Sequence, residues 1–154
     1  NLYRQAPFIL SPLARTSPDT LAFARALVTA VGARPVLLDP ARHDRIMAAI
    51  SHLPFMLAST LMTNVGELAQ ADDSLLPLAA GGFRDTSRLA ASETTMMLDI
   101  LMTNRENVGW LLRVFGERLT DLADRLDRQD ENALYTILQN AAAQRRELYQ
   151  KGIE

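Results

Sequence analysis

Apolar and polar positions divide the chain into a short mixed stretch, residues 1–40, and a longer helical stretch, residues 41–154. In the first stretch, two short apolar runs, PFILSPL and RPVLLDP, are typical of buried strands. Between them, Ser17, Pro18 and Gly32 mark a helix as its N-cap, first residue and stop signal. One strand–helix–strand unit cannot form a stable sheet alone. We therefore predict that the chain begins inside a larger α/β domain.

Beyond Pro40 the pattern predicts helices and no convincing strand. ARHDRIMAAISHLPFMLASTLMTNVGELAQ is a helical stretch, apolar on nearly all sides from Ile46 onward, which is typical of a helix buried all round. Its longest apolar run, Ile46–Met62, is short and interrupted for a membrane span. A further helix is predicted at SETTMMLDILMT, with Ser92 at its start, and another after Asn104 as a cap.

Two later helices carry apolar residues at heptad spacing. The first seam is Val108, Leu112, Phe115, Leu119, Leu122 and Leu126, and the second is Leu134, Ile137 or Leu138, Ala141, Arg145 and Leu148. Gln129-Asp130 provides a short turn between them, with Asp130 as N-cap, and this predicts an antiparallel hairpin. The hairpin needs the apolar helix, a second copy of the chain, or both to cover its seam.

Composition narrows the class of protein. The 154 residues are 48% apolar, which is enough for a core, and the net charge of -2 argues against nucleic acid as the main partner. The absence of cysteine excludes disulfides and thiolate metal sites, and it fits a reducing compartment. No signal peptide is visible, although the chain does not begin with methionine. We expect a soluble, cytoplasmic chain with no membrane partner.

Ser51, His52 and Pro54 are unusual near the start of an apolar helix. Pro54 has no N–H, so the carbonyl of Ile50 loses its helical partner, and a kink would leave polar groups for a ligand. Spacing alone favours the alternative, a kinked core helix with a hydrogen-bonded histidine. His43 is the only other histidine, and no metal site is expected.

The stretch AGGFRDTSR could hold an anion. Gly81 and Gly82 permit positive φ and a close backbone approach, while Arg84 and Arg88 would share one face of a helical turn. A guanidinium group matches a carboxylate or phosphate. The alternative is a loop with an Asp85–Arg88 bridge and a solvated Arg84. The glycines match neither a P-loop nor a dinucleotide fingerprint, and no complete catalytic apparatus is recognisable.

Together, the stretches APFILSP, LVTAVGARPVLLDPARHDRIMAAISHLP, GGFRDTSRLAASE and DILMTNRE resemble the prephenate dehydrogenase family of tyrosine biosynthesis, in the family's order. The resemblance implies a mainly α fold. Residues 1–40 would be the last βαβ fragment of a Rossmann-like nucleotide-binding domain, and residues 41–154 an all-helical domain that dimerises and binds substrate. It also implies NAD or NADP as cofactor, bound mainly by the nucleotide-binding domain, and a homodimer that binds prephenate.

The reaction that the resemblance implies is oxidative decarboxylation of prephenate to 4-hydroxyphenylpyruvate. The family's catalytic histidine lies in the nucleotide domain, so no catalytic residue is expected in this chain, which alone would be inactive. The resemblance assigns substrate binding to seven residues: Arg88, which holds a carboxylate across the dimer interface, Ser51, His52, Gly81, Gly82, Asp85 and Met97. Ser51 would also contact the cofactor.

Two positions depart from the family pattern. Phe55 stands where many members have a second histidine, and Met97 stands where many have tryptophan. Three alternatives stay open: an arogenate dehydrogenase, a related β-hydroxyacid-type dehydrogenase, and a helical dimerisation module without its own activity. The stretch GGFRDTSR favours a prephenate dehydrogenase over a β-hydroxyacid-type dehydrogenase.

Overall fold

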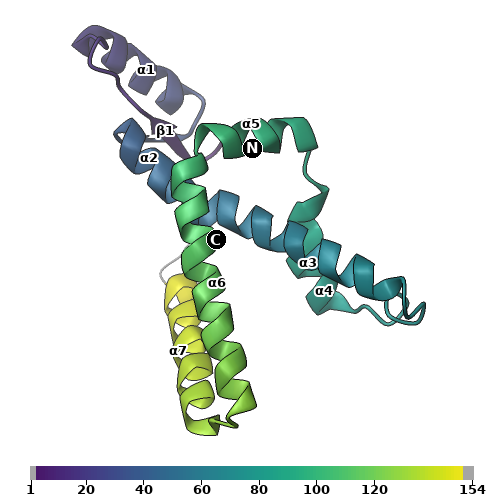
Figure 1. The fold of residues 1–154 in the computed structure, drawn as a ribbon. Helices are drawn as coiled ribbons and strands as arrows, with labels where there is room; N and C mark the ends of the chain where they lie inside the picture. The colour runs from purple at the N-terminus through teal and green to yellow at the C-terminus, as the bar shows by residue number, and fades with distance from the viewer. Residues whose placement is uncertain (1–2, 151–154) are drawn as a thin grey trace. The chain divides into compact units, whose positions relative to one another are not determined.

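The computed structural model describes residues 3–150, whose elements follow the predicted order (Figure 1). They are β1 (Pro7–Leu10), α1 (Pro18–Ala30), β2 (Arg34–Leu37), α2 (Pro40–Met47), the π-helical turn η1 (Ala48–His52), α3 (Leu53–Ala69), α4 (Gly81–Ser87), the 3₁₀ turn η2 (Arg88–Ala91), α5 (Thr94–Thr103), α6 (Arg105–Asp127) and α7 (Glu131–Gln150). The prediction of a mainly α fold that follows a βαβ fragment is confirmed.

The chain forms two compact units, one ending at Leu111 and one beginning at Leu112, so helix α6 crosses from the first to the second. Each unit is described by itself below. The predicted domain boundary after residue 40 stays a prediction.

The two strands of the βαβ fragment pair in parallel, with Pro7 opposite Arg34 and Leu10 opposite Leu37. The sheet has only these two strands within residues 3–150. Its apolar side chains are incompletely covered, and Phe23 of α1 is 72% exposed. This matches the expectation that the fragment needs further strands to complete a core.

Local signals set the ends of α1 as the sequence predicts. The Ser17 hydroxyl accepts a hydrogen bond from the Thr20 N–H at 3.2 Å, and Pro18 is the first helical residue. Gly32 follows the helix with φ of 85°, a left-handed conformation that glycine adopts without steric cost.

The apolar helix is continuous from Pro40 to Ala69, but it widens at η1 in the middle. The Leu53 N–H donates to the carbonyl of Ala48, five residues back, just before Pro54. The irregularity predicted at this proline is therefore present, as a π-helical turn. Such turns are rare and occur frequently at functional sites.

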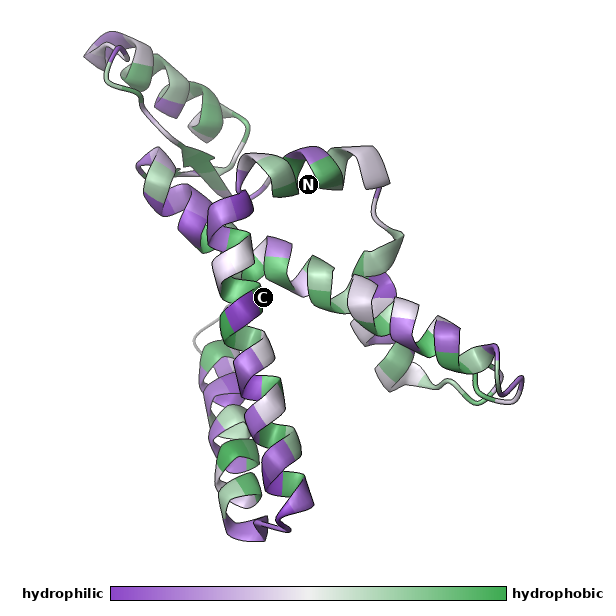
Figure 2. Cartoon of the chain, in the orientation of Figure 1, coloured by the Kyte–Doolittle hydropathy of each residue, from purple (hydrophilic) through white to green (hydrophobic). Residues whose placement is uncertain are grey.

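The prediction that this helix is buried all round is wrong for the single chain. Only Ala48 and Ala58 are buried, while Ile50 is 67% exposed and Leu68 61%. Figure 2 colours the chain by hydropathy and shows hydrophobic residues along this helix. A helix that is apolar on all sides has to be buried, but its sequence does not indicate whether the same chain or another chain buries it. By length and composition alone the helix could cross a membrane, contrary to the expectation from sequence. Core helices of soluble proteins pass the same test.

In the second unit, α6 and α7 are joined by a short turn, as predicted. The Asp130 carboxylate accepts from the Ala133 N–H at 3.1 Å, which confirms Asp130 as the N-cap of α7. Near the turn, Arg125 of α6 and Ile137 of α7 line one cavity, which places the two helices together there. In α6, Leu119 is 51% exposed although Val108 is buried and Phe115 half-buried. The heptad positions of α7 are more exposed, with Leu138 67% and Leu148 50% exposed.

Candidate functional site

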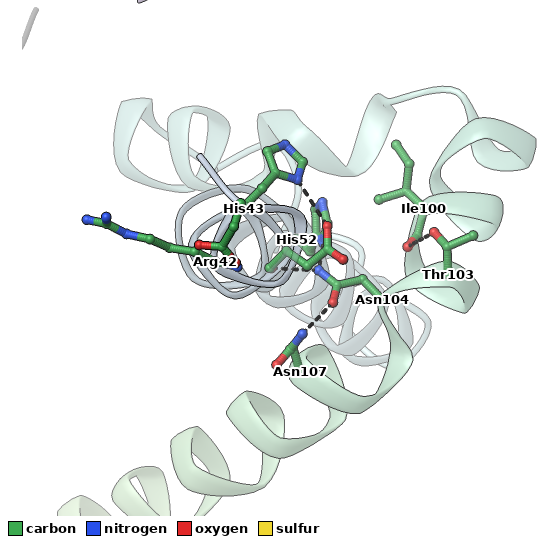
Figure 3. Close-up of polar contacts among 9 residues, drawn as sticks. Arg42, His43, His52, Ile100, Thr103, Asn104 and Asn107 are labelled. Carbon is green, nitrogen blue, oxygen red and sulfur yellow. Dashed lines mark hydrogen bonds and ion pairs between the residues drawn. The ribbon is translucent and has the colours of Figure 1, made fainter. Parts of the chain in front are cut away.

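The best-defined polar cluster in the described chain surrounds His52, the last residue of η1 (Figure 3). The π-helical turn leaves Ser51 exposed and His52 half-buried. The His52 ring points toward Asn104, which stands between α5 and α6. The turn thus places a histidine in the polar junction of three helices instead of an apolar packing layer.

Asn104 connects the elements of this cluster. Its Nδ2 donates to the backbone carbonyl of Asp44 in α2 at 2.8 Å, and it lies 3.3 Å from His52 Nδ1. Its Oδ1 accepts from Asn107 Nδ2 at 2.8 Å. Asn104 is the one buried polar residue among residues 3–150, at 7% exposed. Its amide groups are all hydrogen-bonded, as buried polar groups generally are.

The surroundings of His52, chiefly its burial, favour the neutral ring. Burial lowers the pKa of His52 below its ordinary value, and the nearby His43 lowers it further. The Asp44 carboxylate opposes this effect, although it also forms an ion pair with His43 at 3.0 Å. His52 is therefore less readily protonated than a free histidine, whose pKa is about 6.5.

A cavity of 360 Å³ opens beside His52. Its lining is His43, Asp44, Met47, His52, Ile100, Thr103 and Asn104. Its volume lies within the range of ligand pockets, and its lining combines apolar side chains with a few converging polar groups. The cluster can thus bind a small polar molecule through hydrogen bonds, while the apolar residues contact its carbon skeleton.

The second predicted stretch forms a separate exposed segment. Helix α4 begins at Gly81 and continues into η2, and both elements pack on α3. Gly81 and Gly82 are helical and have no positive φ, so the chain starts a helix there and does not use the conformation that these glycines permit. Arg88 begins η2 and is exposed. Its guanidinium is accessible to an anionic ligand or to another protein chain.

The ion pair in this segment differs from the expected one. Asp85 pairs with its neighbour Arg84, Nε to Oδ1 at 3.3 Å, and the described residues show no Asp85–Arg88 bridge. The change from α4 to the 3₁₀ turn η2 falls between Asp85 and Arg88, so the two residues do not share a regular α-helical turn.

Of the predicted site residues, only His52 lines the 360 Å³ cavity. Ser51 adjoins it in sequence on η1, while Gly81, Gly82, Asp85 and Arg88 lie on the α4–η2 segment. Met97 is buried in α5 at 7% exposed. Phe55 is half-buried in the first turn of α3. The roles that the family resemblance gives to these residues stay predictions.

Sequence reasoning missed the function of Asn104 within the cluster. The residue was predicted as a helix cap, and α6 does begin directly after it. However, its side chain bonds to α2, His52 and Asn107 instead of to the first amides of α6. For α5, the sequence predicts a helix start at Ser92 with Glu93, and the Glu93 carboxylate is the group that accepts from the first backbone amides, while Ser92 Oγ donates to the Leu89 carbonyl.

The residues present do not form a cradle for a dinucleotide. The connection between β1 and α1, residues 11–17, has no glycine, so it is not the glycine-rich phosphate-binding turn that a Rossmann fold carries after its first strand. No group of three or more metal-ligating side chains occurs in the part of the chain that the structure describes. A nucleotide would need residues other than these for most of its binding.

The described residues form a mainly helical region that follows a βαβ fragment, with a polar cluster and a cavity among its helices. A family model described as "Prephenate dehydrogenase, dimerization domain" matches residues 39–140. The chain belongs to the prephenate dehydrogenase family.

Several known proteins are similar to the chain. The prephenate dehydrogenase of Lactococcus lactis is 29% identical over 134 residues, which are 87% of this chain and 36% of that protein. A structure of Aquifex aeolicus prephenate dehydrogenase in complex with hydroxyphenyl propionate and NAD+ matches with a TM-score of 0.89 and 29% identity, over 96% of this chain and 52% of that one. Synechocystis arogenate dehydrogenase matches with a TM-score of 0.79 and 29% identity, over 95% and 53%. The chain therefore spans between a third and about half of these relatives.

Proposed function

We propose that this chain is the substrate-binding and dimer-forming part of a prephenate dehydrogenase. The observation that carries the proposal is the hydrogen-bonded cluster of His52 and Asn104 at a 360 Å³ cavity, within the segment that matches the family. Beside the His43–Asp44 pair, the cavity offers the neutral hydrogen-bonding groups of Thr103 and Asn104, and apolar contacts that suit a small ring compound with oxygen substituents.

The reaction would be the oxidative decarboxylation of prephenate to 4-hydroxyphenylpyruvate. The ring carbon that bears the hydroxyl would lose a hydride to NAD+ or NADP+ while a base takes the hydroxyl proton. Carbon dioxide would then leave, its bonding electrons would make the ring aromatic, and the oxygen would take a proton back to become the phenol hydroxyl. The NAD+ complex of the Aquifex aeolicus relative supports NAD as the cofactor. Parts of the protein beyond this chain would hold most of the nucleotide, with Ser51 near the nicotinamide.

The exposed Arg88 would bind a substrate carboxylate. An exposed guanidinium matches a carboxylate in a two-pronged hydrogen bond. Arg88 does not line the cavity of its own chain, which supports a role for it in the site of the second subunit. Gly81, Gly82 and Asp85 would then shape the pocket around this arginine, and Met97 would support it from α5.

The uncovered apolar residues support a homodimer. Ile50 and Leu68 on the long helix, and Leu119 and Leu138 on the hairpin, are all more than half exposed in the single chain. Burying such residues against a second copy would remove apolar surface from water, the main driving force of association. The same cover would explain an apolar helix in a chain that acts in the cytoplasm.

Similarity to Synechocystis arogenate dehydrogenase favours arogenate as the second candidate substrate. Arogenate carries an amino group where prephenate carries a keto group, so the two differ in charge near the side-chain carboxylate. A module that only dimerises is the remaining alternative, and the exposed seam alone supports it.

The test is the reduction of NAD+ or NADP+ by the intact protein that contains this chain, with prephenate and arogenate as substrates. Prephenate should support reduction, and Arg88→Ala should raise KM by about 30-fold or more, since loss of a paired charge costs about 2 kcal/mol or more. Arg84→Ala, which removes a neighbouring exposed arginine, is the matched control and should leave KM unchanged.

Each other outcome of these assays would favour a different function. Reduction with arogenate alone would replace the proposed substrate, and no reduction with either compound would favour the dimerisation module. Equal KM values for Arg88→Ala and Arg84→Ala would refute the role of Arg88.

A further inference from the structure

We infer that Asn104 is a positioning residue that fixes His52 as a neutral hydrogen-bond donor, with its ring proton on Nε2. The inference deepens the proposed function, because it states which hydrogen-bonding group His52 offers to a molecule in the cavity. The identity of that molecule rests on the proposed function, whereas the tautomer does not. The tautomer follows from the hydrogen bonds that Asn104 makes to Asp44, His52 and Asn107.

The orientation of the Asn104 amide is determined by the Asp44 carbonyl. A carbonyl oxygen only accepts hydrogen bonds, so the Asn104 atom 2.8 Å from it must be the NH₂ nitrogen. The other end of the amide, Oδ1, faces the Asn107 side chain at 2.8 Å, which completes the same orientation. Rotating the amide by half a turn would place two oxygen atoms against each other at the Asp44 carbonyl.

The orientation of Asn104 in turn determines the His52 tautomer. The Asn104 NH₂ group can only donate, and it lies 3.3 Å from His52 Nδ1. Nδ1 must therefore be the unprotonated, accepting nitrogen. A neutral imidazole has one N–H, so its proton lies on Nε2.

The surroundings of His52 keep the ring neutral. The titratable groups that face it are His43 and Asp44, both from α2, and the α5–α6 side presents the uncharged Thr103 and Asn104. Protonation of Nδ1 would place an N–H against the Asn104 NH₂ and break their hydrogen bond. Burial and the nearby His43 also disfavour the cation.

The chemical consequence is that His52 acts as a donor. Nε2–H can donate to a carboxylate, carbonyl or hydroxyl oxygen of the ligand, but this nitrogen has no lone pair with which to remove a proton. His52 thus contributes orientation and binding, and the base for the hydroxyl proton has to come from another residue.

The first test measures the tautomer directly by ¹⁵N NMR of the histidine-labelled chain, since the two ring nitrogens have distinct shifts in each tautomer. His43→Gln leaves one ring and assigns the signals. We expect the Nε2–H form of His52 from neutral to mildly alkaline pH. An Nδ1–H form, or an even mixture, would overturn the inference whether or not the protein is an active dehydrogenase.

The second test removes the donor. In Asn104→Ala the tautomers should mix, and the pKa of His52 should rise by about half a pH unit to one pH unit, because a lost neutral hydrogen bond is worth about 0.5–1.5 kcal/mol. Asn107→Ala keeps the donor and is the matched control. An unchanged His52 spectrum in a folded Asn104→Ala would contradict the inference, and if that variant does not fold, the wild-type tautomer still decides.

The intact enzyme provides a readout that a purely structural role would not change. If the substrate binds only when His52 is neutral, kcat/KM should fall on the acid side as His52 becomes protonated. This fall, the acid limb of the pH profile, should occur at a lower pH than protonation of an unperturbed histidine would produce. The limb should move to higher pH in Asn104→Asp, where a carboxylate faces the ring. A limb that stays in place in this variant would show that His52 protonation does not govern substrate binding.

Discussion

The cluster around His52 and the α4–η2 segment around Arg88 both carry polar groups suited to a ligand, but they differ in how those groups are satisfied. At His52 a buried asparagine connects α2, η1 and α6 through hydrogen bonds, and the cluster is complete within the chain. Arg88 is exposed, and its neighbour Arg84 pairs only with Asp85 on the surface. The His52 cluster is thus preorganised, whereas the Arg88 side chain has no ion pair or hydrogen bond among residues 3–150. This difference fits the proposal that two subunits complete the site.

The largest effect is expected on dimer formation, when a charge is placed on the apolar surface that the second subunit would cover. Leu119→Glu places a charge on the exposed seam of α6, and burying an unpaired charge in an interface is costly. We expect the dimer dissociation constant to rise by at least about 100-fold, as for a central interface residue. Sedimentation velocity measures the change.

Arg118→Glu, an exposed polar neighbour on the same helix, is the control and should have a much smaller effect. A dimer that tolerates both changes equally would show that the seam of α6 is not the interface. The α4–η2 segment would then need a different explanation for its unpartnered arginine.

A smaller effect is expected on the free energy of unfolding, which should fall for a substitution in the His52 cluster and not for one in the α4–η2 segment. Asn104→Ala removes its hydrogen bonds to the Asp44 carbonyl, which keeps the Ala48 N–H, and to His52 Nδ1 and the Asn107 amide, so it should lower the free energy of unfolding by about 1–3 kcal/mol. Arg84→Ala removes an exposed ion pair, which contributes little, so its denaturant midpoint should match that of the wild type. Equal losses in both variants would contradict the distinction between a closed cluster and an open segment.

Local features of the fold could be predicted from sequence because their causes lie within a few residues. Ser17, Pro18 and Gly32 set the ends of α1, and Asp130 caps α7. The disturbance at Pro54 was also predictable, since a missing N–H always interrupts helical bonding. Its form, a π-helical turn, depends on packing that the local sequence does not specify.

The missed features depend on contacts between distant parts of the chain. Asn104 bonds to residues 60 and 52 positions away, so local sequence indicates only a cap. Burial of the long helix was overestimated because an apolar pattern does not distinguish cover by the same chain from cover by a second one. Asp85 pairs with Arg84 because the helix changes to 3₁₀ geometry before Arg88.

The central claim, that one subunit provides the His52 cluster and the other provides Arg88, can be tested by mixing two defective subunits of the intact protein. His52→Ala and Arg88→Ala homodimers would each be impaired at both sites. A mixed dimer would have one site with both residues and one with neither. If half of the dimers are mixed, about a quarter of wild-type activity should return, and no recovery beyond the separate variants would contradict the account.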